Sequence, residues 1–210
     1  MKRLPLTLRS GTCIILEGLD RAGKSTQIEM LRAALDPAST VFAHMPSGFV
    51  PFTNRVYAAL EGRNAEGVVD GAERPASDLA QQLAHLACHA ESMGRLVAAV
   101  EDGALVLDRW WWSTLAYGWF GGSVEQSGLG EASFYDLIRT IWEPIKPSLV
   151  FVFLEPHQSD CNNSAGVEAG YRELLAKNTE FSFPVPNGTA DQVHDFIVAT
   201  LDGRGVLLSR

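Results

Sequence analysis

The sequence predicts an α/β fold in which a central parallel β-sheet is flanked by helices on both faces. Apolar runs alternate with longer amphipathic stretches along the chain, which is typical of parallel strands joined by helices. The first apolar run, 12–16, enters a glycine-bearing loop that a helical stretch follows directly. With 210 residues, of which 46% are apolar and 20% charged, the chain suits a single domain spanning 1–210.

The first half of the chain is expected to contribute three strands and three helices. Apolar periodicity and turn residues set their bounds, and the longest helix is capped by Ser77 and ended by Gly103. Residues 62–75 are polar and glycine-bearing, so we expect a surface loop there. The expected elements are strands at 12–16, 40–44 and 104–107, helices at 25–35, 52–60 and 77–102, and a turn at 45–48.

The second half is expected to complete the sheet. Its clearest central strand is 148–154, whereas 181–185 is expected as a last interior strand and 203–208 as an edge strand. The other expected elements are helices at 110–119, 132–142, 167–177 and 191–201, with loops at 121–130 and 155–166. Sheets of this kind bind ligands at the carboxyl ends of their strands. The residues expected along that rim are Gly18, His44, Asp108 and Glu155.

A phosphate-binding loop lies between the first strand and the first helix. Residues 18–25 read glycine, four residues, then Gly-Lys-Ser, which is the P-loop pattern in its strand–loop–helix setting. The glycines let several backbone N–H groups face one anion, and the helix that follows adds the positive end of its dipole. The sequence therefore predicts a P-loop NTPase fold. The residues expected to bind ATP are Gly18, Ala22, Gly23, Lys24, Ser25 and Thr26.

A second chemical signal is Asp108-Arg109, at the end of the third buried strand. An aspartate in this position can orient the water shell of a magnesium ion, and an adjacent arginine can clamp a phosphate. The hydroxyl of Ser25 can hold the same ion. We therefore expect ATP and Mg²⁺ as cofactors, with Ser25 and Asp108 as the magnesium-binding residues.

Two charged residues within the phosphate loop indicate the class of substrate. Asp20 is an acid among anions, which is costly unless it meets a donor such as a sugar hydroxyl or a backbone amide. Arg21 is placed where it can reach the bridge between donor and acceptor, as an arginine finger supplied by the chain itself. The alternative interpretation is that both residues point to solvent as a salt-bridged loop tip. Under the first interpretation, the catalytic residues are Arg21, Lys24, Asp108 and Arg109.

With these motifs the chain resembles the thymidylate kinase family of P-loop nucleoside monophosphate kinases. The resemblance is carried by 17–27 (EGLDRAGKSTQ) and by 108–117 (DRWWWSTLAY), which is similar to the family's Asp-Arg-Tyr-x-x-Ser-x-x-Ala-Tyr segment. Residues 46–48 (PSG), followed by Arg55, are similar to the family's Pro-Gly-Gly turn and its downstream phosphate-holding arginine. An arginine inside the phosphate loop matches the family branch that keeps its catalytic arginine there rather than in the lid.

The resemblance implies a role for each matching residue. It implies that Asp20 holds the sugar 3′-hydroxyl and that Arg55 and Arg109 hold the acceptor monophosphate. It also implies that Lys24 and Arg21 act on the phosphoryl group in transfer.

The chain departs from the family in its base-binding helix and its lid. Where the family has a phenylalanine that stacks on thymine, and an arginine four residues on, this chain has His85 and His89. Gly118 replaces the family's glutamine, and the lid, about 156–169, contains no arginine or lysine. Three consecutive tryptophans, 110–112, cannot share one helical face, so we expect one or two to line the acceptor pocket. The expected acceptor-binding residues are Asp20, Arg55, His85, His89, Arg109, Trp110 and Tyr117.

The leading hypothesis is ATP- and Mg²⁺-dependent phosphorylation of a pyrimidine deoxynucleoside monophosphate, either dTMP or a 5-modified dUMP, to its diphosphate. A first alternative is a DNA-modification kinase that phosphorylates the hydroxyl of a modified pyrimidine, such as 5-hydroxymethyluracil, in DNA. The tryptophans and the short lid favour it, and the net charge of −8 argues against it. A second alternative is a non-catalytic regulator that binds ATP. The intact set of charged loop residues argues against a regulator.

Composition indicates the compartment and the partners. Cys13, Cys88 and Cys161 are odd in number and far apart, which fits a reducing cytoplasm rather than a disulfide framework. No apolar stretch approaches the roughly 20 residues that span a bilayer, so no membrane partner is expected. We expect a small-molecule nucleotide as substrate, DNA only under the first alternative, and a homodimer, which the long helices favour.

Overall fold

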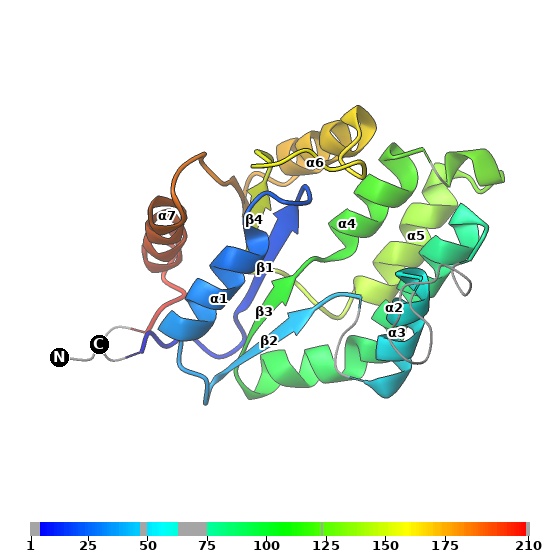
Figure 1. Ribbon diagram of the computed structural model, residues 1–210. Helices are drawn as coiled ribbons and strands as arrows, with labels where there is room; N and C mark the ends of the chain where they lie inside the picture. Colours follow the sequence, from blue (N-terminus) through cyan, green and yellow to red (C-terminus); the bar gives the residue numbers. More distant parts are fainter. Residues whose placement is uncertain (1–4, 47–49, 63–74, 123, 209–210) are drawn as a thin grey trace.

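Five parallel strands form one central sheet in the order β2-β3-β1-β4-β5 (Figure 1). The computed structural model describes residues 5–46, 50–62, 75–122 and 124–208. The strands are β1 (Cys13–Gly18), β2 (Thr40–His44), β3 (Ala104–Asp108), β4 (Leu149–Phe153) and β5 (Ser182–Pro184). The predicted α/β fold with a parallel sheet is confirmed.

Helices cover both faces of this sheet (Figure 1). On one face α1 packs against α7, and on the other α3 packs against β3 and α5, while α4 packs against β1, α3 and α5. Helix α2 lies against α3, and α6 packs against α4 and the π-helical turn η1. The bounds are α1 (Lys24–Ala34), α2 (Pro51–Leu60), α3 (Asp78–Asp102), α4 (Trp111–Leu115), η1 (Ala116–Phe120), η2 (Glu125–Ser127), α5 (Glu131–Trp142), α6 (Ala165–Lys177) and α7 (Ala190–Gly203). Within the described ranges, no helix is long and apolar enough to cross a membrane.

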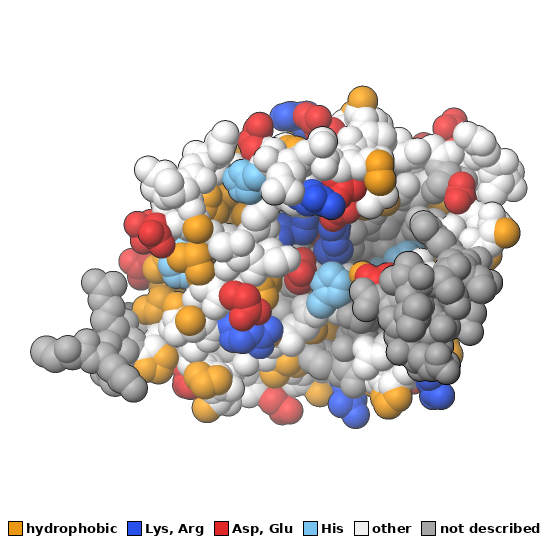
Figure 2. Space-filling model, viewed as in Figure 1, with side chains coloured by type: hydrophobic (Ala, Val, Ile, Leu, Met, Phe, Trp, Pro, Cys, Tyr) orange, Lys and Arg blue, Asp and Glu red, His pale blue; other side chains and the backbone are white. Residues whose placement is uncertain are grey.

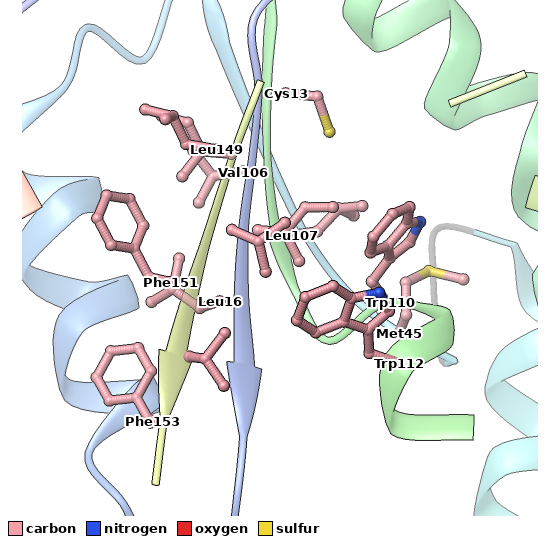
Figure 3. Packing of buried hydrophobic residues seen from close by; sticks show 14 of the residues in the cluster. Cys13, Leu16, Met45, Val106, Leu107, Trp110, Trp112, Leu149, Phe151 and Phe153 are labelled. Carbon is pink, nitrogen blue, oxygen red and sulfur yellow. The ribbon is translucent and has the colours of Figure 1, made fainter. Parts of the chain in front are cut away.

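The strand side chains alternate between the two faces and build two halves of one core (Figure 3). Leu16 and Phe151, which are register partners in β1 and β4, point toward α1. Cys13 and Leu107 point the opposite way, to the side of the sheet on which Trp112 lies. Because side chains alternate along a strand, Glu17 must point to the same side as Cys13. A carboxylate is thus directed at the start of α4.

The structure corrects the expected elements in three places. β5 is the edge strand rather than an interior one, since α7 follows it and crosses to the face that holds α1. Residues 203–208 form no edge strand; α7 runs to Gly203, and only an isolated bridge joins Leu207 to Leu8. The expected helix 110–119 is split into α4 and η1, where the N–H of Gly121 donates to the carbonyl of Ala116, five residues back.

The cap that the sequence predicts for the longest helix is confirmed, because the Ser77 hydroxyl accepts from the backbone N–H of Ala80. The expected loop at 62–75 and the turn at 45–48 fall largely outside the described residues.

Candidate active site

Two glycines give the phosphate loop its shape. Gly18 ends β1 with a φ of 123°, and a Cβ on it would lie 2.1 Å from the carbonyl oxygen of Phe153. Gly23 precedes α1 with a φ of 95°, and a Cβ there would meet the ring of His157 at 3.3 Å. Both positions therefore require glycine. The loop is held close to β4 at Gly18 and leads directly into the N-terminus of α1, where the helix dipole favours an anion.

Lys24 is buried beneath this loop. Its Nζ donates to the carbonyls of Gly18 at 3.0 Å and Leu19 at 2.6 Å. Burial, assisted by the positive charge of Arg109, lowers the pKa of Lys24 to about 7. An anion on the loop would favour the charged ammonium and draw it outward, so Lys24 is available to a polyphosphate.

Glu17 joins the end of β1 to the start of α4. Its Oε1 accepts from the backbone N–H groups of Trp110 at 2.6 Å and Ser113 at 3.0 Å. Its Oε2 accepts from the hydroxyls of Ser113 at 2.6 Å and Tyr171 at 3.0 Å. Burial raises the pKa of Glu17, while these hydrogen bonds and Arg109 act in the opposite direction. The carboxylate thereby fixes the chain that directly follows Arg109, at the start of α4.

Asp108 lies at the end of β3, level with the phosphate loop. Its Oδ2 is 3.1 Å from Nδ1 of His44, whereas its Oδ1 is buried and has no hydrogen-bond partner among the described residues. Burial acts to raise the pKa of Asp108, but the His44 hydrogen bond and nearby positive charges outweigh it and lower that pKa. Asp108 lines the same cavity as Ser25, and an ionised carboxylate with one oxygen lacking a partner in the described chain fits a hard cation such as Mg²⁺.

Arg109 pairs with the phosphate loop. Its Nη2 forms an ion pair with Oδ1 of Asp20, and its Nη1 donates to the Ser113 hydroxyl at 3.0 Å. The guanidinium also lies over the ring of Tyr117, 5.4 Å from the centroid. Burial opposes the charge, but neighbouring tyrosines and carboxylates raise the pKa of Arg109 above its ordinary value. The residue is therefore a permanent cation in a partly enclosed site.

The predicted lid is docked on the phosphate loop. The exposed side chain of Arg21 donates from Nε to Asp160 at 2.8 Å and from Nη1 to Gln158 at 3.0 Å. The side chain of Asn163 accepts from the N–H of Asp20 and donates to its carbonyl, both at 2.9 Å. The ion pair of Arg21 is what the loop-tip interpretation expects of that residue, whereas Asp20 is turned to Arg109 rather than to solvent.

Three cavities open around these residues, and Figure 2 shows this face hollowed where basic, acidic and histidine side chains gather. The central cavity, about 500 Å³, is lined by Asp20, Arg21, Gly23, Lys24, Ser25, Thr26, His44, Tyr57, Asp108, Arg109, His157 and Gln158. The α3 cavity, about 410 Å³, is lined by Asp20, Met45, Pro46, Tyr57, Leu60, Glu61, Gln81, Gln82, His85, His89, Arg109, Trp110, Ser113, Thr114, Tyr117 and Asn162. The β5 cavity, about 80 Å³, lies between Thr26 and the loop at 185–190.

Most of the residues predicted for the acceptor lie together in the α3 cavity. Trp110 lines it, while Trp112 is completely buried in the core. Trp110 is the one tryptophan of 110–112 that lines this cavity as the described residues define it, and that the cavity binds the acceptor stays a prediction. Burial, with the charge of Arg109, lowers the pKa of His85 to about 4, so its ring is neutral.

Arg55 is exposed on α2 and is not among the described residues that line these three cavities. Its role stays a prediction.

Sequence reasoning missed several contributors to the site. A Cβ on Gly118 would lie 3.0 Å from Cδ of Gln82, so the glycine leaves room for a glutamine that α3 directs into the α3 cavity. Asn163 gave no signal in the sequence, because its role depends on how the lid docks. His157 lines both the central cavity and the β5 cavity. Glu17 does lie inside the 17–27 motif, but nothing in that motif predicts its buried hydrogen bonds to Trp110, Ser113 and Tyr171.

Comparisons with known proteins agree with this geometry. The thymidylate kinase family model matches residues 16–162. The chain is similar to a probable thymidylate kinase of Thermococcus kodakarensis, 32% identical over 153 residues, which cover 71% of this chain and 69% of that protein. A probable thymidylate kinase of Thermococcus onnurineus is 28% identical and covers 90% of this chain and 96% of its own.

Solved structures give the same fold. Thymidylate kinase from Ehrlichia chaffeensis superposes with a TM-score of 0.70 at 20% identity, covering 91% of this chain and 98% of that chain. Thymidylate kinase from Candida albicans gives a TM-score of 0.67 at 21% identity, covering 97% of each chain. At these identities the likeness establishes a shared fold.

Proposed function

The chain belongs to the thymidylate kinase family and is a nucleotide kinase, and we propose that it transfers the γ-phosphoryl group of ATP, with Mg²⁺, to a pyrimidine deoxynucleoside monophosphate. The acceptor in this proposal is dTMP or a 5-modified dUMP, and the product is its diphosphate. Transfer is direct and in line, so the chain supplies positioning and charge rather than a covalent intermediate.

The observation that carries this proposal is the meeting of two cavities. Asp20, Tyr57 and Arg109 line both the central cavity and the α3 cavity. A triphosphate on the phosphate loop and a monophosphate beside Arg109 would therefore approach each other end to end. This arrangement supports direct transfer, since a positioned pair of reactants removes much of the entropic barrier.

The donor side follows from the loop. In our proposal, Lys24 gives up its hydrogen bonds to the carbonyls of Gly18 and Leu19 and binds the outer phosphates of ATP. Arg21 leaves Asp160 and binds the phosphoryl group in transfer. The adenine ring lies toward the β5 cavity, beside Thr26 and Asn187. His157, which lines both cavities, adds a ring against the polyphosphate.

A magnesium ion fits the oxygens on this cavity. Ser25 would hold it directly, and the carboxylate of Asp108 would hold it or orient its water shell. When bound, the ion neutralises charge on the phosphates. His44 keeps Asp108 ionised and oriented through its hydrogen bond to Oδ2.

The acceptor side is proposed from the α3 cavity. Arg109 holds the acceptor phosphate, and Asp20 accepts from the sugar 3′-hydroxyl while it keeps Arg109 in place. The base lies among His85, His89, Trp110 and Tyr117. Arg55 would have to swing in from α2 to reach the phosphate. A homodimer and a cytoplasmic location remain predictions.

The two alternatives lack a specific supporting observation in the described part of the site. A DNA strand would have to pass the carboxylates of Asp20 and Glu61 on the α3 cavity, which repel its phosphates. The paired and ionised set around Asp108 and Arg109 is costly to keep in a protein that only binds ATP.

A turnover assay tests the proposal. The purified chain is given ATP, Mg²⁺ and each of a panel of deoxynucleoside monophosphates, 5-substituted dUMP analogues included, and diphosphate formation is followed by chromatography. A second reaction contains DNA with 5-hydroxymethyluracil and γ-labelled ATP. We expect diphosphate from at least one pyrimidine and no label in DNA; label only in DNA, or no turnover at all, would contradict the proposal.

A further inference from the structure

A hydrogen bond from outside the α3 cavity fixes the proton on one of its histidines. His89, on α3, is 2% exposed, and its Nδ1 lies 3.1 Å from the indole nitrogen Nε1 of Trp142, on α5. The two rings meet edge to face, with their centroids 5.2 Å apart. An indole N–H can only donate, so Nδ1 of His89 must be the unprotonated acceptor. The neutral ring therefore carries its proton on Nε2.

The ring of His89 is also held neutral. Burial, with His85 acting in the same direction, lowers the pKa of His89 to about 3. Near neutral pH, His89 is consequently a single chemical species: an imidazole that accepts at Nδ1 and donates at Nε2.

The donor nitrogen of His89 faces the α3 cavity. Nε2 has no hydrogen-bond partner in the part of the chain that the structure describes, and yet it is not one of the fully enclosed side-chain atoms. His89 lines the α3 cavity and is the most deeply buried polar side chain that does so. The cavity thus has, at its floor, one N–H donor of fixed identity and no protein partner to satisfy it.

We propose that the Trp142–His89 pair makes the α3 cavity select pyrimidines that carry a carbonyl at C4 over those that carry an amino group there. The inference rests on the proposed function, because it takes the acceptor base to lie in this cavity. C4 is opposite the sugar-bearing N1 across the ring, so it is the edge that reaches the floor when the phosphate is beside Arg109. A C4 carbonyl accepts from Nε2–H, whereas an amino group sets a donor against a donor.

Trp142 is then a positioning residue that acts through His89. It is 2% exposed and lines neither the central cavity nor the α3 cavity as the described residues define them. If its N–H is removed, the His89 proton can move to Nδ1, and Nε2 can accept from an amino group. Selectivity should fall without loss of the acceptor site itself.

Trp142→Phe and Trp112→Phe form a matched pair of variants. The first keeps an aromatic ring and removes the N–H that binds His89. The second removes the indole N–H of an equally buried tryptophan from the same aromatic cluster, one that has no partner within the described ranges. dUMP and dCMP are the acceptors, because they differ at C4 and not at C5. The ratio of their kcat/KM values is measured together with the tautomer of His89 by long-range ¹H–¹⁵N NMR.

We expect wild type to show the Nε2–H tautomer and to prefer dUMP, Trp142→Phe to lower the dUMP/dCMP ratio about tenfold, and Trp112→Phe to leave it unchanged. If Trp142→Phe does not fold, His89→Gln gives the same reading, since an amide offers both a donor and an acceptor. Turnover with a ratio that neither Trp142→Phe nor His89→Gln lowers, or an Nδ1–H tautomer in wild type, overturns this inference alone. No turnover with any monophosphate overturns the proposed function as well.

Discussion

Arg109 is ion-paired with Asp20 on the wall that the central cavity and the α3 cavity share. One residue comes from the end of β3 and the other from the phosphate loop, so the pair joins two loops that are distant in sequence. Since the side chain of Arg109 also donates to Ser113, the guanidinium is held in a fixed plane. In the proposed function, the acceptor site therefore depends on a carboxylate of the phosphate loop.

Asp20→Asn should therefore damage the acceptor site selectively. The variant keeps the shape of the side chain and removes the charge that orients Arg109, so we expect the KM for the acceptor to rise roughly tenfold to a hundredfold. The KM for ATP should change less than about threefold. Steady-state kinetics with each substrate varied in turn measure both. Asp136→Asn, which breaks an exposed Asp–Arg pair on α5, is the matched control; equal effects on both substrates would contradict the interpretation.

We expect Lys24 to make ATP binding depend on pH. In the free protein the pKa of Lys24 is about 7, because the group is buried beside Arg109. A bound polyphosphate favours the ammonium form, so binding takes up a proton and the affinity should weaken as the pH rises above 7. Calorimetry of ATP binding near pH 8 in buffers of different ionisation enthalpy detects this uptake. Binding without proton exchange would mean that Lys24 is already charged in the free protein.

Arg21 is proposed to act on the transferring phosphoryl group despite its ion pair with the lid. Arg21→Ala should lower kcat by about 10³ or more, as expected of an arginine finger. Asp160→Asn, which breaks only the exposed pair, should change kcat less than about threefold. Arg172→Ala removes another exposed arginine with a carboxylate partner and serves as the control. If Arg21→Ala raises only KM, Arg21 is a binding residue and not a catalytic one.

Glu17 is expected to stabilise the fold around Arg109. Glu17→Ala leaves the buried backbone N–H of Trp110 without a partner and removes three further hydrogen bonds, from the N–H and hydroxyl of Ser113 and the hydroxyl of Tyr171, so the free energy of unfolding should fall by roughly 3–5 kcal/mol. Glu17→Gln keeps an oxygen for those N–H groups and lets the hydroxyls turn to accept, so it should lose only about 1–2 kcal/mol. Urea unfolding followed by tryptophan fluorescence measures both, with Glu29→Gln on α1 as a surface control. Equal losses for the two variants would show that the backbone contacts do not matter.

The fold was largely predictable because its determinants are local. The strands β1, β3 and β4 are short and mainly apolar, with a carboxylate only near the carboxyl ends of β1 and β3, and the phosphate loop marks which strand precedes which helix. The π-helical turn η1 could not be predicted from the sequence, since it depends on packing around Gly121 rather than on hydrophobic periodicity. The edge position of β5 depends on where α6 and α7 pack, which a single strand pattern does not encode.

The residues of the site were predictable where they belong to one local motif and not where they depend on tertiary packing. Residues within one motif, such as Gly18 to Ser25 or Asp108 with Arg109, could be named because the chemistry requires them at a fixed spacing. Contacts between distant segments could not: Asn163 reaches Asp20 only because the lid docks on the loop. Gln82 enters the α3 cavity only because Gly118 has no side chain in its way. Tertiary packing alone brings these pairs together.

The most direct test is binding of a bisubstrate compound in which a polyphosphate chain joins the 5′ carbons of adenosine and thymidine. If donor and acceptor meet end to end across Asp20 and Arg109, calorimetry should show one molecule bound per chain, more tightly than ATP or dTMP, and in competition with both. A compound that competes with ATP but leaves dTMP binding untouched would contradict a shared site for phosphoryl transfer.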